Sequence, residues 1–205
     1  MLTLYYAAKT CALASHIVLE QIGCPYQARK LDFANQQQRS PEYLAVNPKG
    51  RVPALATGRG VITETPAILL YLAQTFPQAG LAPLDDPFEL AQAQAVNSYM
   101  ASTVHVAHAH KRRGARWADD PAAQESMQRK VAANMVDCFE LIEREMLRGP
   151  WVLGDALSIC DAYLFTMTTW LPGDGVEIAR FARVADHHQR MLALPAVQRT
   201  LAQHD

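Results

Sequence analysis

The stretch YYAAKTCALASHIVLEQIGCPY, residues 5–26, decides how the fold begins. It starts inside a short apolar run, residues 2–6, of the kind that predicts a β-strand. Apolar residues then recur at helical spacing over residues 12–23, and Gly23 is a typical residue at the end of a helix. Cys11 therefore stands where a strand passes into the first turn of a helix.

Two readings of this cysteine follow from its position. The first turn of a helix has unpaired N–H groups and a partial positive charge, and thiol pKa values fall there from about 8.5 to roughly 3.5–7.5. A buried cysteine, by contrast, packs as a small apolar side chain. Position alone leaves both readings of Cys11 open. The other cysteines form no C-x-x-C pair, and we expect free, inert thiols at Cys24, Cys138 and Cys160.

The rest of the first 77 residues predicts an α/β domain. Residues 26–32 are expected to be extended, and Ser40 with Pro41 has the chemistry of a helix start. The segment NPKGRVPALAT, residues 47–57, combines a turn with a strand over residues 52–56, and a hairpin into Val61-Ile62 follows. The segment TETPAILLYLAQTF, residues 63–76, predicts a helix capped by Thr63 or Thr65.

The remainder of the chain predicts only helices. Residues 78–87 are rich in Pro, Gly and Asp and are expected to form a linker. Residues 88–205 form the second predicted domain, which is all-α. Its expected helices cover residues 87–117, 121–147, 158–171, 178–192 and 195–203.

Composition excludes several classes of partner. The net charge is −1, so we expect no nucleic acid to bind by bulk electrostatics. No apolar run reaches the roughly 18 residues of a membrane helix, and we expect no membrane partner. The start of the chain lacks a signal-peptide pattern, which predicts a cytoplasmic protein.

Two further motifs carry chemistry. If the peptide bond between Val52 and Pro53 is cis, the backbone of Val52 turns outward and can pair with an extended peptide, although a trans bond is the commoner state. Glu64, Thr65 and Pro66 open a predicted helix. A helix start with a hydroxyl suits a carboxylate and a neighbouring carboxylate suits an ammonium group, although the same residues form ordinary helix caps.

Together these features resemble the glutathione-binding, thioredoxin-like domain of cytosolic glutathione transferases. The resemblance extends over the whole chain and is carried by the segments YYAAKTCALASHIVLE, NPKGRVPAL, TETPAILLYLA and LSICDAYLFT. The placement of the cysteine is most similar to the bacterial beta class. The implied architecture is a thioredoxin-like N-terminal domain followed by an all-α domain.

The resemblance also implies roles for individual residues. Cys11 matches the active-site cysteine, and Val52 before a cis Pro53 would pair with the cysteinyl backbone of glutathione. Glu64 and Thr65 would hold the γ-glutamyl ammonium and carboxylate. The lysine that often contacts the glycyl end is replaced here by a polar loop, in which the substitutes are Gln36 or Arg39. Thr10 is a minor candidate for a contact with the glutathione sulfur.

The helical region has a polar stripe of its own. At 3.6 residues per turn, one face carries Ser98, Ala101, Ser102, His105, His108 and Arg112. His105 matches a histidine that reaches glutathione in the beta class, and the stripe is expected to line the second-substrate site and to keep glutathione anionic. A metal site built from His105 and His108 is not expected, because no cysteine or carboxylate accompanies them.

Three other residues are assigned to structure. Ser158-x-x-Asp161 is a capping-box pattern that also matches a folding motif of the family, so Asp161 is assigned to stability. Tyr5 and Tyr6 point to opposite faces of a strand, and both are assigned to packing, although other transferase classes use a tyrosine there.

The resulting functional hypothesis is an enzyme that conjugates glutathione, as co-substrate, to small apolar electrophiles, and the resemblance implies a homodimer. One alternative is thiol–disulfide exchange through a mixed disulfide on Cys11. A second alternative is a non-catalytic binding or scaffold protein, since a fold alone does not choose a reaction.

Overall fold

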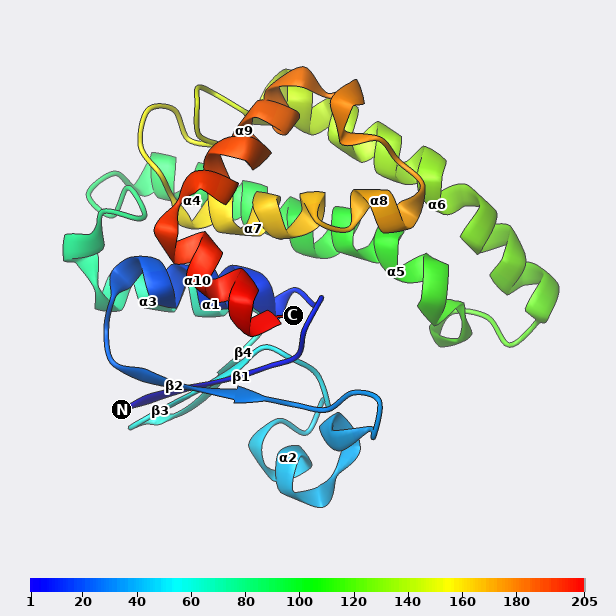
Figure 1. Cartoon of the computed structure of the whole chain (residues 1–205), viewed down its shortest axis with the longest axis horizontal. Helices are drawn as coiled ribbons and strands as arrows, with labels where there is room; N and C mark the ends of the chain where they lie inside the picture. Colours follow the sequence, from blue (N-terminus) through cyan, green and yellow to red (C-terminus); the bar gives the residue numbers. More distant parts are fainter. Residues whose placement is uncertain (205) are drawn as a thin grey trace.

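A computed structural model describes residues 1–204 and contains one four-stranded sheet of order β2-β1-β3-β4 (Figure 1). Strand β1 pairs in parallel with β2 and antiparallel with β3, and β3 forms an antiparallel hairpin with β4. The strands are β1 (Leu2–Tyr6), β2 (Tyr26–Lys30), β3 (Ala54–Thr57) and β4 (Gly60–Thr63). The short apolar strands in the middle of the sheet are its buried part, and Leu4 and Leu55 are inaccessible to solvent.

Helices lie on both faces of this sheet. Helices α1 (Ala12–Ile22) and α3 (Thr65–Thr75) separate it from the helical part of the chain, and α2 (Pro41–Val46) lies on the opposite face (Figure 1). Helix α1 ends at Gly23, whose φ of 72° is left-handed and costs glycine little. The predicted cap of α2 is present, because the Ser40 hydroxyl accepts a hydrogen bond from the Tyr43 N–H at 3.2 Å.

The chain beyond residue 86 is helical and packs against α1 and α3. None of the helices within residues 1–204 has both the length and the apolar character needed to cross a bilayer. The helices are α4 (Pro87–Tyr99), α5 (His105–Arg113), α6 (Pro121–Leu141), α7 (Ile159–Thr168), α8 (Leu171–Asp174), α9 (Ala182–Ala193) and α10 (Pro195–His204), with π-helical turns at Met100–Val104 and Ile142–Met146.

The predicted fold class is confirmed, and the differences are local. The helix expected over residues 87–117 is interrupted by the π-helical turn, in which one extra residue enters the turn. Helix α3 begins at Thr65 with Glu64 as its cap residue and without a side-chain cap bond, so the predicted cap by Thr63 or Thr65 is wrong. The strand expected from Val52 begins two residues later. The short helix α8 was not expected.

Helix α7 forms the centre of the helical part, and all ten of its residues are buried. Its start is held by the predicted capping box of Ser158 and Asp161. One oxygen of the Asp161 carboxylate accepts hydrogen bonds from the N–H and hydroxyl of Ser158, each at 2.7 Å. The other oxygen accepts from the Val152 N–H at 2.8 Å and lies 2.9 Å from Nε2 of His187. This buried carboxylate joins three separate segments of chain.

The last helix closes the structure against its beginning. Helix α10 packs on α1, and the Tyr6 hydroxyl donates a hydrogen bond to the Gln203 carbonyl at 3.1 Å. Between the helices, His16 Nδ1 lies 3.0 Å from His204 Nε2 in a buried pair. Burial lowers the pKa of His16 to about 4 and that of His204 to about 3. Both rings are therefore neutral at physiological pH.

Removal of the Asp161 carboxylate should be strongly destabilising. Asp161→Ala leaves buried donors of Ser158, Val152 and His187 without their acceptor, and we expect the free energy of unfolding to fall by about 3–5 kcal/mol. Urea denaturation followed by circular dichroism measures this change. The matched control is Asp186→Ala, which removes an exposed carboxylate paired with Arg190 on α9 and should cost under about 0.5 kcal/mol. Equal losses in the two variants would contradict the structural role of Asp161.

The buried histidine pair should make stability depend on pH. An unfolded histidine titrates near 6.5, so the contribution of His16 and His204 is complete above that pH and is lost as pH falls through the window from 6.5 toward 4. Each ring should contribute a slope of up to about 1.4 kcal/mol per pH unit there. In His204→Gln, urea unfolding measured between pH 7.5 and 4.5 should show a shallower slope than the unmodified protein. An unchanged slope would contradict this assignment.

Candidate functional site

A cleft of about 610 Å³ lies between the sheet side of the molecule and the end of α5. One wall comes from the turn after β1, from the loop before β3 and from the start of α3, which contribute residues 9–11, 50–53 and 64–66. The other wall comes from residues between 101 and 117, together with Tyr163 and Trp170. The three segments of the first wall are distant from one another in sequence, and together they face the helical part of the chain across this space. We refer to this space as the cleft.

Cys11 lies at the bottom of the cleft, at the start of α1. Its side chain is 8% exposed, and its Sγ donates a hydrogen bond to the Val52 carbonyl at 3.5 Å. Burial raises the pKa of the Cys11 thiol, and this effect exceeds the opposing effects of a hydrogen bond with Thr65 and of the Arg113 charge. Of the two readings that its position left open, burial favours the neutral thiol, because removal from water disfavours the thiolate. Cys11 reaches the cleft as a protonated thiol.

The hydroxyl of Thr10, next to Cys11, forms hydrogen bonds with backbone groups of its own turn. The Thr10 hydroxyl donates to the Ala7 carbonyl at 2.7 Å and accepts from the Ala12 N–H at 3.3 Å. Thr10 lines the cleft, but its hydroxyl shapes the turn that leads into α1.

The loop before β3 contributes the predicted peptide-binding edge. The bond between Val52 and Pro53 is cis, and both residues line the cleft. The carbonyl of Arg51 accepts hydrogen bonds from the Tyr43 hydroxyl at 2.6 Å and from the Asn47 side-chain amide at 2.7 Å. Two side chains from the α2 region thus fix the loop immediately before Val52.

The start of α3 brings Glu64 and Thr65 to the same wall. Glu64 has a φ of 72°, and its carboxylate pairs with Lys49 at 2.5 Å, from Nζ to Oε1. Thr65 is only 4% exposed and lies at the first helical residue, where the backbone N–H groups of α3 are unpaired. Sequence reasoning missed Lys49, because the NPKG turn gives no sign of where its side chain points.

His105 faces the cleft from α5, and its ring centroid lies 5.0 Å from that of Trp170. Burial lowers the pKa of His105 to about 4, and the charges of Arg113 and other nearby cations act in the same direction. The ring is therefore neutral near pH 7. His105 can donate one hydrogen bond to a ligand but carries no charge of its own, whereas the arginines that line the cleft do.

His108 also lines the cleft and belongs to a second cluster. Its ring stacks on Trp170 with centroids 4.2 Å apart, and its Nδ1 lies 2.7 Å from Oδ2 of Asp174. The Asp174 side chain is fully buried and its other oxygen lies 3.9 Å from Nζ of Lys111. The unexpected helix α8 supplies this carboxylate, which fixes the direction of the His108 ring.

Three predicted site residues do not line the cleft. Ser102 is exposed, and its hydroxyl donates a hydrogen bond to the Ser98 carbonyl at 2.8 Å. Ser98 is exposed, because the π-helical turn at Met100–Val104 lies between it and His105 and rotates the earlier residues away from the stripe. Gln36 is exposed with a φ of 54° in the loop before α2, and its neighbours Gln38 and Arg39 line the cleft instead.

The two early tyrosines pack as predicted. The Tyr5 ring lies 5.6 Å from that of Tyr43, while Tyr6 is buried against α10, and neither lines the cleft. Within residues 1–204, no group of three or more His, Cys, Asp or Glu side chains is arranged to hold a metal ion.

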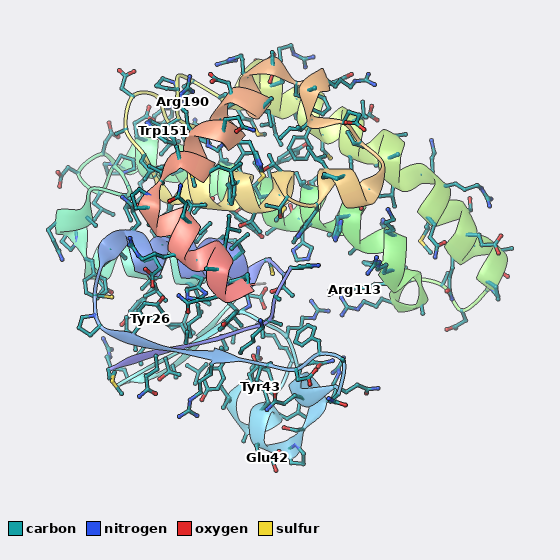
Figure 2. The ribbon with its side chains drawn as sticks, viewed as in Figure 1. Tyr26, Glu42, Tyr43, Arg113, Trp151 and Arg190 are labelled. Atoms are coloured by element: carbon teal, nitrogen blue, oxygen red, sulfur yellow. The ribbon has the colours of Figure 1, made fainter. Side chains whose placement is uncertain are left out.

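Several residues that sequence reasoning did not single out also form the site. Tyr163 of α7 is 1% exposed and lines the cleft beside Cys11 and Thr65, and burial raises the pKa of its hydroxyl. Its position in LSICDAYLFT places it two residues after Asp161, but only the packing of α7 on α1 brings it to the cysteine. Arg113 reaches the cleft from the end of α5, on the side that faces the sheet and α2 (Figure 2).

Known proteins resemble this chain in sequence and in fold. The family described as "Glutathione S-transferase, N-terminal domain" matches residues 1–74. Glutathione S-transferase GstA of Escherichia coli O157:H7 is 30% identical over 202 residues, which cover 97% of this chain and 96% of the relative. A glutathione transferase homologue from Sulfitobacter, crystallised with bound glutathione, is 44% identical with a TM-score of 0.96, covering 99% of this chain and 98% of that one.

A bacterial beta-class glutathione S-transferase from Sphingomonas chungbukensis has a TM-score of 0.85 and 28% identity, covering 98% of each chain. The likeness thus spans the sheet, the helical part and the cleft between them. The chain belongs to the glutathione S-transferase family.

Proposed function

We propose that the protein binds glutathione in the cleft and joins it, through its sulfur, to a small electrophile. The observation that carries the proposal is one wall on which the Cys11 thiol, the edge at Val52 and Pro53, and the start of α3 at Glu64 and Thr65 meet. The Sulfitobacter homologue was crystallised with bound glutathione, and the Escherichia coli relative is named a glutathione S-transferase, which supports the same conclusion.

The residues of this wall fit the chemistry of glutathione. The Val52 backbone suits the cysteinyl peptide unit, the start of α3 at Thr65 suits the γ-glutamyl carboxylate, and the Glu64 carboxylate suits the ammonium group. The glycyl carboxylate is left for a cation of the cleft. We propose Arg39 for it, since Gln36 points elsewhere and Arg39 lines the cleft.

Activation of the glutathione thiol requires positive charge near the sulfur. Arg113 and Arg51 both line the cleft, where the charge of Arg113 acts on the Cys11 thiol and that of Arg51 acts on His105. A permanent charge in the cleft lowers the pKa of a bound thiol, and the neutral His105 can donate a hydrogen bond to the resulting thiolate. The Cys11 thiol can do the same once its hydrogen turns away from the Val52 carbonyl. The sulfur then bonds to the electrophilic carbon, the leaving group departs with its electron pair, and the thiol proton passes to water.

We further propose, from the resemblance, that the protein is a cytoplasmic homodimer of the beta class. The 28% identity to the Sphingomonas chungbukensis enzyme supports the class, and a sedimentation measurement tests the dimer.

Glutathione binding should depend on the Glu64 carboxylate. Glu64→Gln keeps the shape of the side chain and removes the charge that pairs with the ammonium group, so we expect a roughly tenfold weaker Kd by calorimetry. The matched control is Glu42→Gln, at the exposed far side of α2, which should bind as the unmodified protein does (Figure 2). An unmodified protein that releases no measurable heat with glutathione would instead favour a scaffold role.

Cys11 should support conjugation without being essential to it. In Cys11→Ala, conjugation of 1-chloro-2,4-dinitrobenzene should fall no more than about tenfold, because one neutral hydrogen-bond donor is lost. Iodoacetamide should alkylate Cys11 slowly at pH 7 and faster at alkaline pH, since burial raises the pKa of the thiol.

The control for this variant is Cys24→Ala, which removes a half-buried thiol outside the cleft. The result that contradicts the proposal is a Cys11→Ala protein that binds glutathione but conjugates nothing, combined with reduction of glutathionyl disulfides by the unmodified protein. Those two results together would indicate that the protein catalyses thiol–disulfide exchange through Cys11.

A further inference from the structure

The cleft carries far more positive than negative charge. Among residues 1–204, Glu64 supplies the only carboxylate that lines the cleft, and this carboxylate also pairs with Lys49. Positive charge comes from six side chains, which are distributed over both walls of the cleft: Lys9, Arg39, Arg51, Arg112, Arg113 and Arg116. The protein as a whole has a net charge of −1, so this concentration of cations is local to the cleft.

The five arginines of the cleft form no ion pair with any residue that the structure describes. Among residues 1–204, no carboxylate lies within ion-pair distance of any of these guanidinium groups. Elsewhere in residues 1–204 six arginines form ion pairs, as in Arg180 with Glu140 at 2.7 Å and Arg199 with Glu20 at 2.8 Å, whereas the guanidinium groups of Arg29, Arg59 and Arg183 have no carboxylate partner. The cleft therefore brings five guanidinium groups to one place without a carboxylate from the described residues to neutralise them.

These cations lie close enough to repel each other. Burial lowers the pKa of Arg116, and the charges of Arg113, Arg51 and Arg39 lower it further. Three of the arginines lie at or just after the carboxyl end of α5, where the helix dipole favours positive charge. Arg39 and Arg51 come from other segments, so the dipole does not account for the convergence. An anion in the cleft would relieve this repulsion.

Glutathione accounts for only part of the charge. As the thiolate it brings two carboxylates, one sulfur anion and one ammonium group, and Glu64 adds one negative charge to the site. Several of the six cations therefore remain without an anionic partner after glutathione binds. His108 and Lys111 do not add to the surplus, because the buried Asp174 carboxylate faces both.

An aromatic surface lies beside the arginines of α5. Trp117 is 47% exposed at the rim of the cleft, next to Arg116, and its ring packs against His110 with centroids 4.4 Å apart. Trp170 lines the deeper part. Exposed tryptophan beside guanidinium suits a flat ligand that presents a ring to one and an acid group to the other.

We propose that the second substrate is an aromatic electrophile carrying a carboxylate, held by Arg112 and Arg116 with its ring toward Trp117. This inference rests on the proposed transferase function and replaces the expectation of a purely apolar electrophile. The charge of Arg113 acts on the Cys11 thiol, so we assign this guanidinium group to the glutathione sulfur and not to the carboxylate of the second substrate. In the reaction, the glutathione sulfur bonds to the ring carbon, chloride leaves with the electron pair of the carbon–chlorine bond, and the thiol proton goes to water.

The test uses two substrates that differ in one group, 4-chloro-3,5-dinitrobenzoate and 4-chloro-3,5-dinitrobenzamide. Their kcat/KM values with glutathione, each divided by the uncatalysed rate constant, give a preference ratio. The two glutathione conjugates, prepared chemically, are also titrated into the protein by calorimetry, so that binding is measured without turnover. The variants are the double replacement Arg112→Ala with Arg116→Ala and, as control, Arg129→Ala on the exposed face of α6.

We expect the unmodified protein to prefer the benzoate at least tenfold in both measurements, and the double variant to lose about tenfold of that preference. Arg129→Ala should keep the full preference. Equal or weaker binding of the benzoate conjugate overturns the proposal, even if both substrates are conjugated. Tighter binding of that conjugate without turnover of either substrate supports the acid site and contradicts the transferase function.

Discussion

The buried start of α7 is the constraint on which the cleft depends. The Asp161 carboxylate accepts from Ser158 and Val152 and contacts His187, so it fixes where α7 begins and which segments meet there. Tyr163 follows within one helical turn and lies beside Cys11, and α1 packs directly on α7. A carboxylate removed from water is tolerated only with such partners. The two walls of the cleft are therefore placed by a polar cluster that does not itself line the cleft.

Burial favours the uncharged form of two titratable residues that line the cleft, Cys11 and His105. It lowers the pKa of His105 and raises that of the Cys11 thiol, so both groups are uncharged near neutral pH. Positive charge in the cleft is then carried by guanidinium groups, which do not lose their proton. The field at the bottom of the cleft should consequently change little between pH 6 and 8, a property that a histidine-based site would lack.

The sequence predicted the fold better than it predicted the site. Local signals such as Gly23 at the end of α1 and Ser40 at the start of α2 are sufficient to define elements, because each acts within one turn of chain. Ser98 was misplaced because a π-helical turn changes helical phase without an obvious signal in its residues. Tyr163 and Asp174 escaped notice because packing between distant helices decides their positions. The division of the chain at residues 78–87 stays a prediction.

The docking of α10 on α1 has a consequence for biosynthesis. The Tyr6 hydroxyl meets the Gln203 carbonyl across 197 positions of sequence, and the facing surface of α1 is covered by residues near the other end. During translation, β1 and α1 emerge first, and this apolar surface stays uncovered until residues 195–204 leave the ribosome. Contacts between such distant segments also form slowly. The nascent chain should thus be most exposed to chaperones and to aggregation while only its opening half has been made.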